Sequence, residues 1–193
     1  MLEFEKIERP LPANFVMSNL LLLAGAGQNV GKTSFGVACI QYLKRLNYKV
    51  YALKITPHFH SENPAHLIVQ EKDFQISLEK DINGSKDSSR LLRAGADEVF
   101  FVQTKSDQAL AKAFNLVSTL ADNQVLWVCE SGGLREIVEP GLFLYFKMKD
   151  QFPIKASAQR LIPLANRIVA FDGINFDFSP EEIQIQNHRF CLK

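Results

Sequence analysis

The chain has 193 residues, which suits one domain (1–193) with a sizeable core. Hydrophobic residues make up 47% and charged residues 22%, and the formal charge of +1 offers no general attraction to nucleic acid or to an anionic membrane. No apolar run approaches the roughly 18 residues of a membrane-spanning helix, and the three scattered cysteines indicate reduced thiols rather than a disulfide framework. We therefore expect a soluble cytoplasmic protein that binds neither nucleic acid nor membrane.

The first elements form a strand, a turn and a helix. Residues 1–17 are expected to be a surface leader, because Pro10 and Pro12 prevent a regular helix there. The apolar run at 20–24 predicts a buried parallel strand. Apolar residues at helical spacing follow at 33–46, and a glycine-rich turn joins the two elements.

The rest of the chain continues the alternation of strands and helices. A second strand is expected at 50–55, followed by a long polar excursion at 56–85 that has room for a small hairpin. Further strands are expected at 98–104, 124–130, 141–148, 167–173 and 189–193, and helices at 88–96, 108–121 and 156–166, the last with Pro163 at a kink or near its end. This order predicts a mainly parallel sheet covered by helices on both faces, a three-layer α/β/α fold.

The turn between the first strand and helix has the sequence form of a triphosphate cradle. Its glycines let successive backbone N–H groups face one anion, and the following helix adds its N-terminal dipole. Lys32 can reach the β- and γ-phosphates, and the Thr33 hydroxyl can take a position on Mg²⁺. The alternative is a glycine-rich turn whose lysine is only solvated. The candidate nucleotide-binding residues are Gly25, Gly27, Gln28, Asn29, Val30, Gly31, Lys32, Thr33 and Ser34.

Two further strand ends carry charged residues. The strand at 124–130 ends in Glu130, which could hold Mg²⁺ or polarise an attacking group at the carboxyl edge of the sheet. Lys54 stands near the end of the second strand and points either to solvent or to the ligand edge, where it would neutralise phosphate or carboxylate charge. We expect Lys32, Lys54 and Glu130 to form the catalytic set.

The remaining polar candidates are less specific. Asp87 and Arg90 open the helix at 88–96, either as ordinary capping residues or with Asp87 at the metal and Arg90 on an anion. His58 and His60 could face one way and bind a metal or an anion, but no third ligand stands near them.

Four segments in order give the chain a family resemblance. GAGQNVGKT, YALKITPHFH, KDSSRLLRAGADEVFFV and VLWVCESG resemble the molybdopterin-guanine dinucleotide biosynthesis protein B family, a branch of the P-loop NTPases, over roughly residues 18–150. The resemblance implies a homodimer that binds GTP and hydrolyses it weakly, assisting a molybdopterin nucleotidyltransferase. It also implies that Mg²⁺ is held by Thr33, Asp87 and Glu130, with Lys54 completing the site.

The chain departs from that pattern in places. Val30 stands where a small residue is usual, Ser131 replaces a glycine, and no Asn-Lys-x-Asp pattern for guanine is present, so the choice between GTP and ATP stays open. The stretch from Gly25 to Thr33 is also similar to the loop of dethiobiotin synthetase, an ATP-dependent carboxylating ligase, in which Lys32 and Lys54 would stabilise transferred charge. A non-catalytic nucleotide-binding adaptor is the third possibility.

Overall fold

A computed structural model describes residues 15–59, 63, 66–122, 124–150 and 159–193. Its elements are β1 (Phe15–Gly25), α1 (Lys32–Arg45), β2 (Val50–Thr56), β3 (Leu67–Gln70), β4 (Phe74–Leu78), α2 (Asp87–Arg93), β5 (Glu98–Thr104), α3 (Asp107–Ser118), β6 (Leu126–Glu130), η2 (Leu134–Glu136), β7 (Val138–Met148), η3 (Ile162–Leu164), β8 (Arg167–Phe171), η4 (Pro180–Glu182), β9 (Ile183–Gln186) and β10 (Arg189–Leu192).

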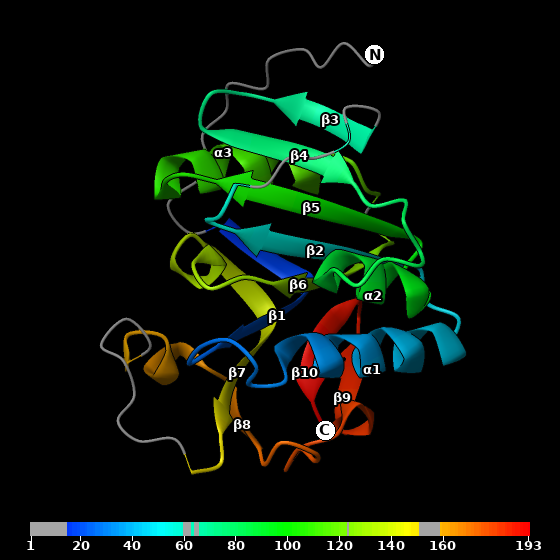
Figure 1. Cartoon of the computed structure of the whole chain (residues 1–193). Helices are drawn as coiled ribbons and strands as arrows, with labels where there is room; N and C mark the ends of the chain where they lie inside the picture. Colours follow the sequence, from blue (N-terminus) through cyan, green and yellow to red (C-terminus); the bar gives the residue numbers. More distant parts are fainter. Residues whose placement is uncertain (1–14, 60–62, 64–65, 123, 151–158) are drawn as a thin grey trace.

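Eight of the strands form one sheet in the order β3-β4-β5-β2-β6-β1-β7-β8, which runs from top to bottom in Figure 1. β5, β2, β6, β1, β7 and β8 pair in parallel, whereas β4 runs antiparallel to both of its neighbours. The predicted mainly parallel sheet is therefore confirmed. The short hairpin expected within 56–85 is the β3–β4 pair, which extends the sheet at one edge.

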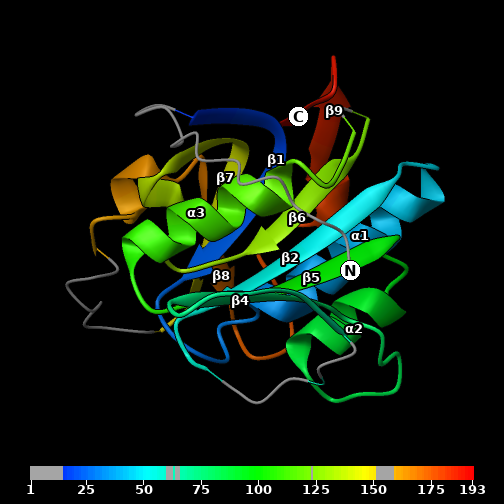
Figure 2. The ribbon, with the colours of Figure 1, turned by 90° about the horizontal axis from the view of Figure 1, so that it is seen from above.

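Two apolar clusters lie on opposite faces of the sheet. One contains Leu110, Phe114 and Val117 of α3, and the other contains Phe35 of α1, Leu91 of α2 and residues of the β9–β10 hairpin. Figure 2, seen from above, shows α3 on one side of the strands and α1 and α2 on the other. The three-layer α/β/α arrangement follows from this burial pattern.

Several boundaries differ from the sequence-based expectation. β1 begins at Phe15, so the last three residues of the expected leader belong to the sheet, and residues 1–14 lie outside the described part. The expected helix at 156–166 does not continue through its described residues: Gln159 is helical, but the chain then turns and forms the short 3-10 helix η3, and residues 156–158 lie outside the described part. Pro163 stands inside that turn and removes a backbone donor that a continuing α-helix would need.

The three cysteines are free thiols. Cys39 and Cys129 are buried in the two faces of the core, and Cys191 in β10 is half-buried. Burial raises the pKa of Cys39 and of Cys129 well above the usual thiol value, which keeps both groups protonated and unreactive.

The pairing of strands β1 and β7 contains an irregularity that requires glycine at position 141. Their parallel register pairs Met17 with Pro140 and then Leu21 with Leu142, so β1 bulges between the two pairs. Gly141 faces this bulge, and a Cβ there would overlap the carbonyl oxygen of Ser18. Because the obstacle is backbone, it cannot move aside without disturbing the strand that leads into the glycine-rich loop.

We expect Gly141→Ala to lower the free energy of unfolding by about 1–3 kcal/mol, because the added methyl group pushes β7 away from β1. Urea unfolding followed by circular dichroism measures this change. Gly132→Ala is the matched control, since a Cβ at Gly132 meets nothing within 4 Å. Equal stability of the two variants would show that the β1–β7 contact is not tight.

Candidate functional site

The parallel pairing of β1, β6 and β2 brings the charged strand ends together. Glu130 is the register partner of Leu23 in β1 on one side and of Lys54 in β2 on the other. Because the carboxyl ends of parallel strands share one edge of a sheet, Glu130 and Lys54 both lie beside the loop that leaves β1. The sheet thus positions two of the predicted residues before any side-chain contact is considered.

The loop from Gly25 to Gly31 turns sharply between β1 and α1. The backbone N–H of Ala26 donates to the carbonyl of Phe146 at 2.9 Å, which ties the start of the loop to β7. Asn29 and Gly31 both have positive φ, of 59° and 88°. Left-handed residues between right-handed ones turn successive backbone N–H groups inward, and such a concave nest favours an anion.

Gly31 is required at its position for two reasons. It is the N-cap of α1 with a left-handed conformation, and a Cβ there would lie 2.5 Å from the ring of Phe176. Phe176 stacks on Phe171 with 4.6 Å between ring centroids and packs edge-on against Phe35 of α1. The aromatic segment after β8 therefore supports the loop from outside, a contact that nothing in the loop sequence indicates.

The first turn of α1 faces the carboxylate at the end of β6. The Thr33 hydroxyl donates to Glu130 Oε2 at 2.7 Å, although the two residues are 97 positions apart. Lys32 Nζ donates to the carbonyl oxygen of Gly27 at 2.6 Å and lies 4.0 Å from Glu130 Oε1. Lysine, threonine and carboxylate are thus assembled around one point at the mouth of the loop.

Lys54 connects this group to α2. Its ammonium lies 2.7 Å from Glu130 Oε1 and 2.7 Å from Asp87 Oδ2, and its side chain is only 16% exposed. Asp87 also lies 3.6 Å from Arg90 on the same helix, and Arg90 Nη2 donates to Ser34 Oγ at 3.1 Å. A continuous chain of charged groups therefore crosses from the loop through β6 and β2 to α2.

These contacts shift the pKa values of the charged groups. Burial lowers the pKa of Lys32, an effect that the nearby carboxylate of Glu130 opposes only in part. Burial also acts to lower the pKa of Lys54, but Glu130 and Asp87 together raise it above the usual lysine value. For Asp87, burial would raise the pKa, and its contacts with Lys54 bring it below the usual aspartate value.

A cleft of about 1150 Å³ opens at this edge of the sheet, and we call it the loop cleft. It holds most of the predicted site residues, including His58. It is lined by Gly25, Gly27, Gln28, Asn29, Gly31, Lys32, Thr33, Ser34, Lys54, Ile55, Thr56, His58, Lys86, Asp87, Ser88, Arg90, Phe101, Glu130, Ser131, Gly132 and Phe171.

Among the described residues, the predicted Val30 does not line the loop cleft, whereas residues such as Phe101 and Phe171 line it without having been predicted. The side chain of Val30 is buried at 2% exposure in the core, so only its main chain faces the loop. His60 lies outside the described residues. Phe171 ends β8 at the cleft wall and was missed, because an aromatic residue at the end of an apolar strand does not stand out from ordinary core residues.

The loop cleft offers oxygen donors suited to Mg²⁺. The Thr33 hydroxyl, the Glu130 carboxylate and the Asp87 carboxylate are hard ligands of the kind that this cation prefers. No group of three or more His, Cys, Asp and Glu residues within the described ranges could hold a metal by itself. The donor set therefore fits a Mg²⁺ ion that takes its remaining ligands from phosphate oxygens and water.

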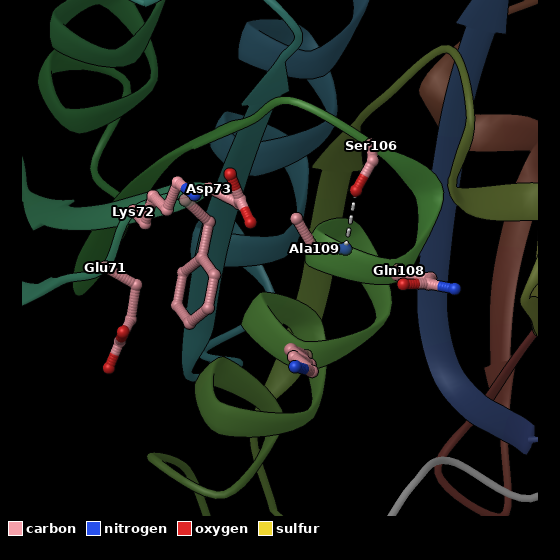
Figure 3. Close-up of a pocket in the computed structure, with 8 residues that line it drawn as sticks. Glu71, Lys72, Asp73, Ser106, Gln108 and Ala109 are labelled. Carbon is pink, nitrogen blue, oxygen red and sulfur yellow. Dashed lines mark hydrogen bonds between the residues drawn. The ribbon is translucent and has the colours of Figure 1, made fainter.

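A second, smaller cavity of about 120 Å³ lies between the β3–β4 turn and the start of α3. Figure 3 shows Ser106 capping α3, with its Oγ accepting from the backbone N–H of Ala109 at 3.2 Å, and the charged turn of Glu71, Lys72 and Asp73 opposite. None of the predicted site residues lines it. We assign no ligand to this cavity.

Comparison with known proteins does not assign a function to this chain. No protein-family model and no curated protein sequence matches the chain. Among solved structures, it is similar to LpxK from Aquifex aeolicus, described as an "apo" form in complex with ATP, with 15% identity and a TM-score of 0.42 over 82% of this chain and 51% of that one. The chain thus spans about half the length of LpxK, and a likeness this distant carries no information on ligand or activity. In the described part of the chain, no helix is both long and apolar enough to cross a bilayer.

We expect Glu130→Gln to lower the free energy of unfolding of the nucleotide-free protein by about 1–3 kcal/mol, because it removes one of the two carboxylates that stabilise the half-buried charge of Lys54. Glu139→Gln, at an exposed position of β7, is the isosteric control. Urea unfolding at neutral pH measures both variants, and equal stability would contradict the importance of the Lys54–Glu130 pair.

The same variant should change the pH dependence of stability. A raised lysine pKa contributes stability that is complete below the unfolded-state pKa and is lost as pH rises through the folded-state pKa. Without Glu130, burial of Lys54 is opposed by Asp87 alone, so the pKa of Lys54 falls. The stability advantage of wild type over Glu130→Gln should therefore be complete at neutral pH and should shrink as pH rises through the folded-state pKa of Lys54, measured by urea unfolding from pH 7 to above the usual lysine pKa of about 10.4.

Proposed function

We propose that the chain binds a nucleoside triphosphate with Mg²⁺ in the loop cleft and hydrolyses it slowly. The observation that carries the proposal is the 2.7 Å hydrogen bond from Thr33, in the first turn of α1, to Glu130, at the end of the neighbouring parallel strand. In P-loop proteins a hydroxyl and a carboxylate at these two places hold the cation of the bound nucleotide. The strand, glycine-rich loop and helix around them follow the order of that motif.

The loop residues have separate tasks in this proposal. The backbone N–H groups between Gly27 and Thr33 bind phosphate oxygens, aided by the N-terminal end of α1. Lys32 exchanges the carbonyl of Gly27 for the β- and γ-phosphates. Burial lowers the pKa of Lys32, and the negative charge of the phosphates would oppose this effect and keep the ammonium charged. Thr33 and Glu130, now hydrogen-bonded to each other, are the residues that would hold the cation, directly or through water.

Lys54 and Asp87 adjust the charge of the cleft. Asp87 is a third candidate ligand of Mg²⁺, directly or through water, and Lys54 balances the carboxylates that surround the cation. Bound Mg²⁺ would neutralise charge on the phosphate oxygens. Release of a carboxylate by Lys54 frees its ammonium to face the γ-phosphate, so Lys54 belongs with Lys32 and Glu130 in the proposed catalytic set.

Calorimetry with ATP and with GTP, each with Mg²⁺, tests the proposal. We expect wild type to bind one of the two nucleotides at micromolar to millimolar concentration and Lys32→Ala to bind it about 10-fold or more weakly, because the mutation removes a charge on the β- and γ-phosphates. Lys49→Ala removes a charge on the surface away from the cleft and serves as control. If wild type binds neither nucleotide at millimolar concentration, the proposal is wrong.

We infer the more specific role from the residue pattern. The order of the loop, Lys54, the Asp87 helix and Glu130 along the chain supports a factor that assists the guanylation of molybdopterin. In that role the protein is a homodimer, prefers GTP and binds a molybdopterin nucleotidyltransferase. Light scattering of the purified protein tests the dimer, and co-purification with a molybdopterin nucleotidyltransferase tests the partner.

A carboxylating ligase is the second candidate. It is favoured by the position of Lys54, whose ammonium lies in the cleft beside the loop, where it would stabilise a carbamate as well as phosphate. This enzyme would consume ATP only in the presence of a small amine and bicarbonate. We expect no such dependence if the first role is correct, and a coupled assay of ADP release with and without a diamine and bicarbonate decides between them.

A further inference from the structure

Arg90 brings a guanidinium group to the mouth of the loop cleft from the opposite wall. Its Nη2 donates to Ser34 Oγ at 3.1 Å, and Ser34 directly follows Thr33 in the first turn of α1. Its Nη1 lies 3.6 Å from Asp87 Oδ1. The guanidinium thus spans the cleft between α2 and the end of α1 that would face the phosphates.

The helix that carries Arg90 is held firmly in place. Leu91 is 2% exposed in the same apolar cluster as Phe35 of α1, so α2 is packed against the helix that begins at the loop. At the start of α2, the hydroxyls of Ser88 and Ser89 both donate to the carboxylate of Glu79, which directly follows β4. Because α2 is held both by apolar packing and by hydrogen bonds, the guanidinium that it carries is preorganised and needs no large movement to act.

The contacts of Arg90 differ from those of Lys54. Lys54 is held by two carboxylates at 2.7 Å, whereas Arg90 lies 3.6 Å from the Asp87 carboxylate and makes its shorter contact, at 3.1 Å, with the neutral hydroxyl of Ser34. Its side chain is 37% exposed, and Arg90 is one of the residues that line the cleft. A guanidinium has several N–H donors in a planar fork, which suits it to the spread-out negative charge of a phosphoryl group in transfer.

We propose that Arg90 is a catalytic residue that stabilises the charge of the transferring γ-phosphoryl group from within the same chain; this inference rests on the proposed function. In the step, a water oxygen bonds to the γ-phosphorus while the bond from that phosphorus to the β–γ bridging oxygen breaks. The electron pair of the broken bond leaves on the nucleoside diphosphate, and the water proton passes to the released phosphate. Arg90 contacts γ-phosphate oxygens during this transfer. It therefore binds the transition state more strongly than it binds the intact triphosphate.

The test separates binding of the ground state from binding of the transition state. Calorimetry with Mg²⁺ compares a non-hydrolysable triphosphate with the diphosphate–aluminium fluoride complex, using whichever nucleoside wild type prefers. We expect Arg90→Ala to bind the triphosphate within a few-fold of wild type and to lose about 100-fold or more in turnover and in affinity for the aluminium fluoride complex. Arg90→Lys keeps the charge without the fork and should recover only part of the loss.

Two controls exclude a merely structural effect. Arg45→Ala removes the same charge from the far end of α1, where Arg45 is 65% exposed, and should behave as wild type. Guanidinium ion at millimolar concentration should partly restore turnover to Arg90→Ala, because it can enter the space left by the side chain, and it should do nothing for Lys32→Ala.

The outcomes distinguish this inference from the proposed function. If wild type binds no nucleotide, the proposed function is wrong and the role of Arg90 falls with it. If wild type binds normally and Arg90→Ala keeps full affinity for the aluminium fluoride complex, only the role of Arg90 is wrong. Equal losses for the triphosphate and for the aluminium fluoride complex would likewise overturn it, because Arg90 would then be a binding residue without a catalytic part.

Discussion

The half-buried ammonium of Lys54 is the constraint on which the arrangement of the cleft depends. A charge that is 16% exposed at the end of a central strand must have partners, because its desolvation is otherwise costly. One partner is Glu130 on the adjacent parallel strand, and the other is Asp87 on a helix from a different part of the chain. Satisfying this one cation therefore fixes the position of α2 against the end of the sheet and brings Arg90 within reach of α1.

Several polar and charged groups of the cleft already have protein partners before any ligand arrives. Lys54 lies between two carboxylates, Thr33 donates to one of them, and Lys32 is bound to the carbonyl of Gly27. A Mg²⁺–nucleotide complex would have to exchange these partners, which offsets part of the attraction between phosphate and cation. The proposed site consequently favours reversible binding over very tight retention of the nucleotide.

The sequence could predict the central part of this site because local patterns determine it. An apolar strand, a glycine-rich turn and a helical pattern place Lys32 and Thr33, and an apolar strand that ends in Glu130 needs only parallel pairing to lie beside them. The bond from Arg90 to Ser34 and the stacking of Phe171 on Phe176 depend on tertiary packing, for which no local pattern exists. The strand β9 was missed although its residues, IQIQ, alternate with the period of a strand.

The support of Gly31 by Phe176 ties the beginning of the molecule to a segment far along the chain. During synthesis, the strand, loop and first helix leave the ribosome long before the aromatic segment that follows β8. Until Phe176 has emerged, stacked on Phe171 and packed against Phe35, the left-handed turn that begins α1 lacks its outer support. A nascent chain thus carries the complete glycine-rich sequence well before the loop has this support, so any nucleotide bound as proposed would meet the supported loop only after the later segment has docked.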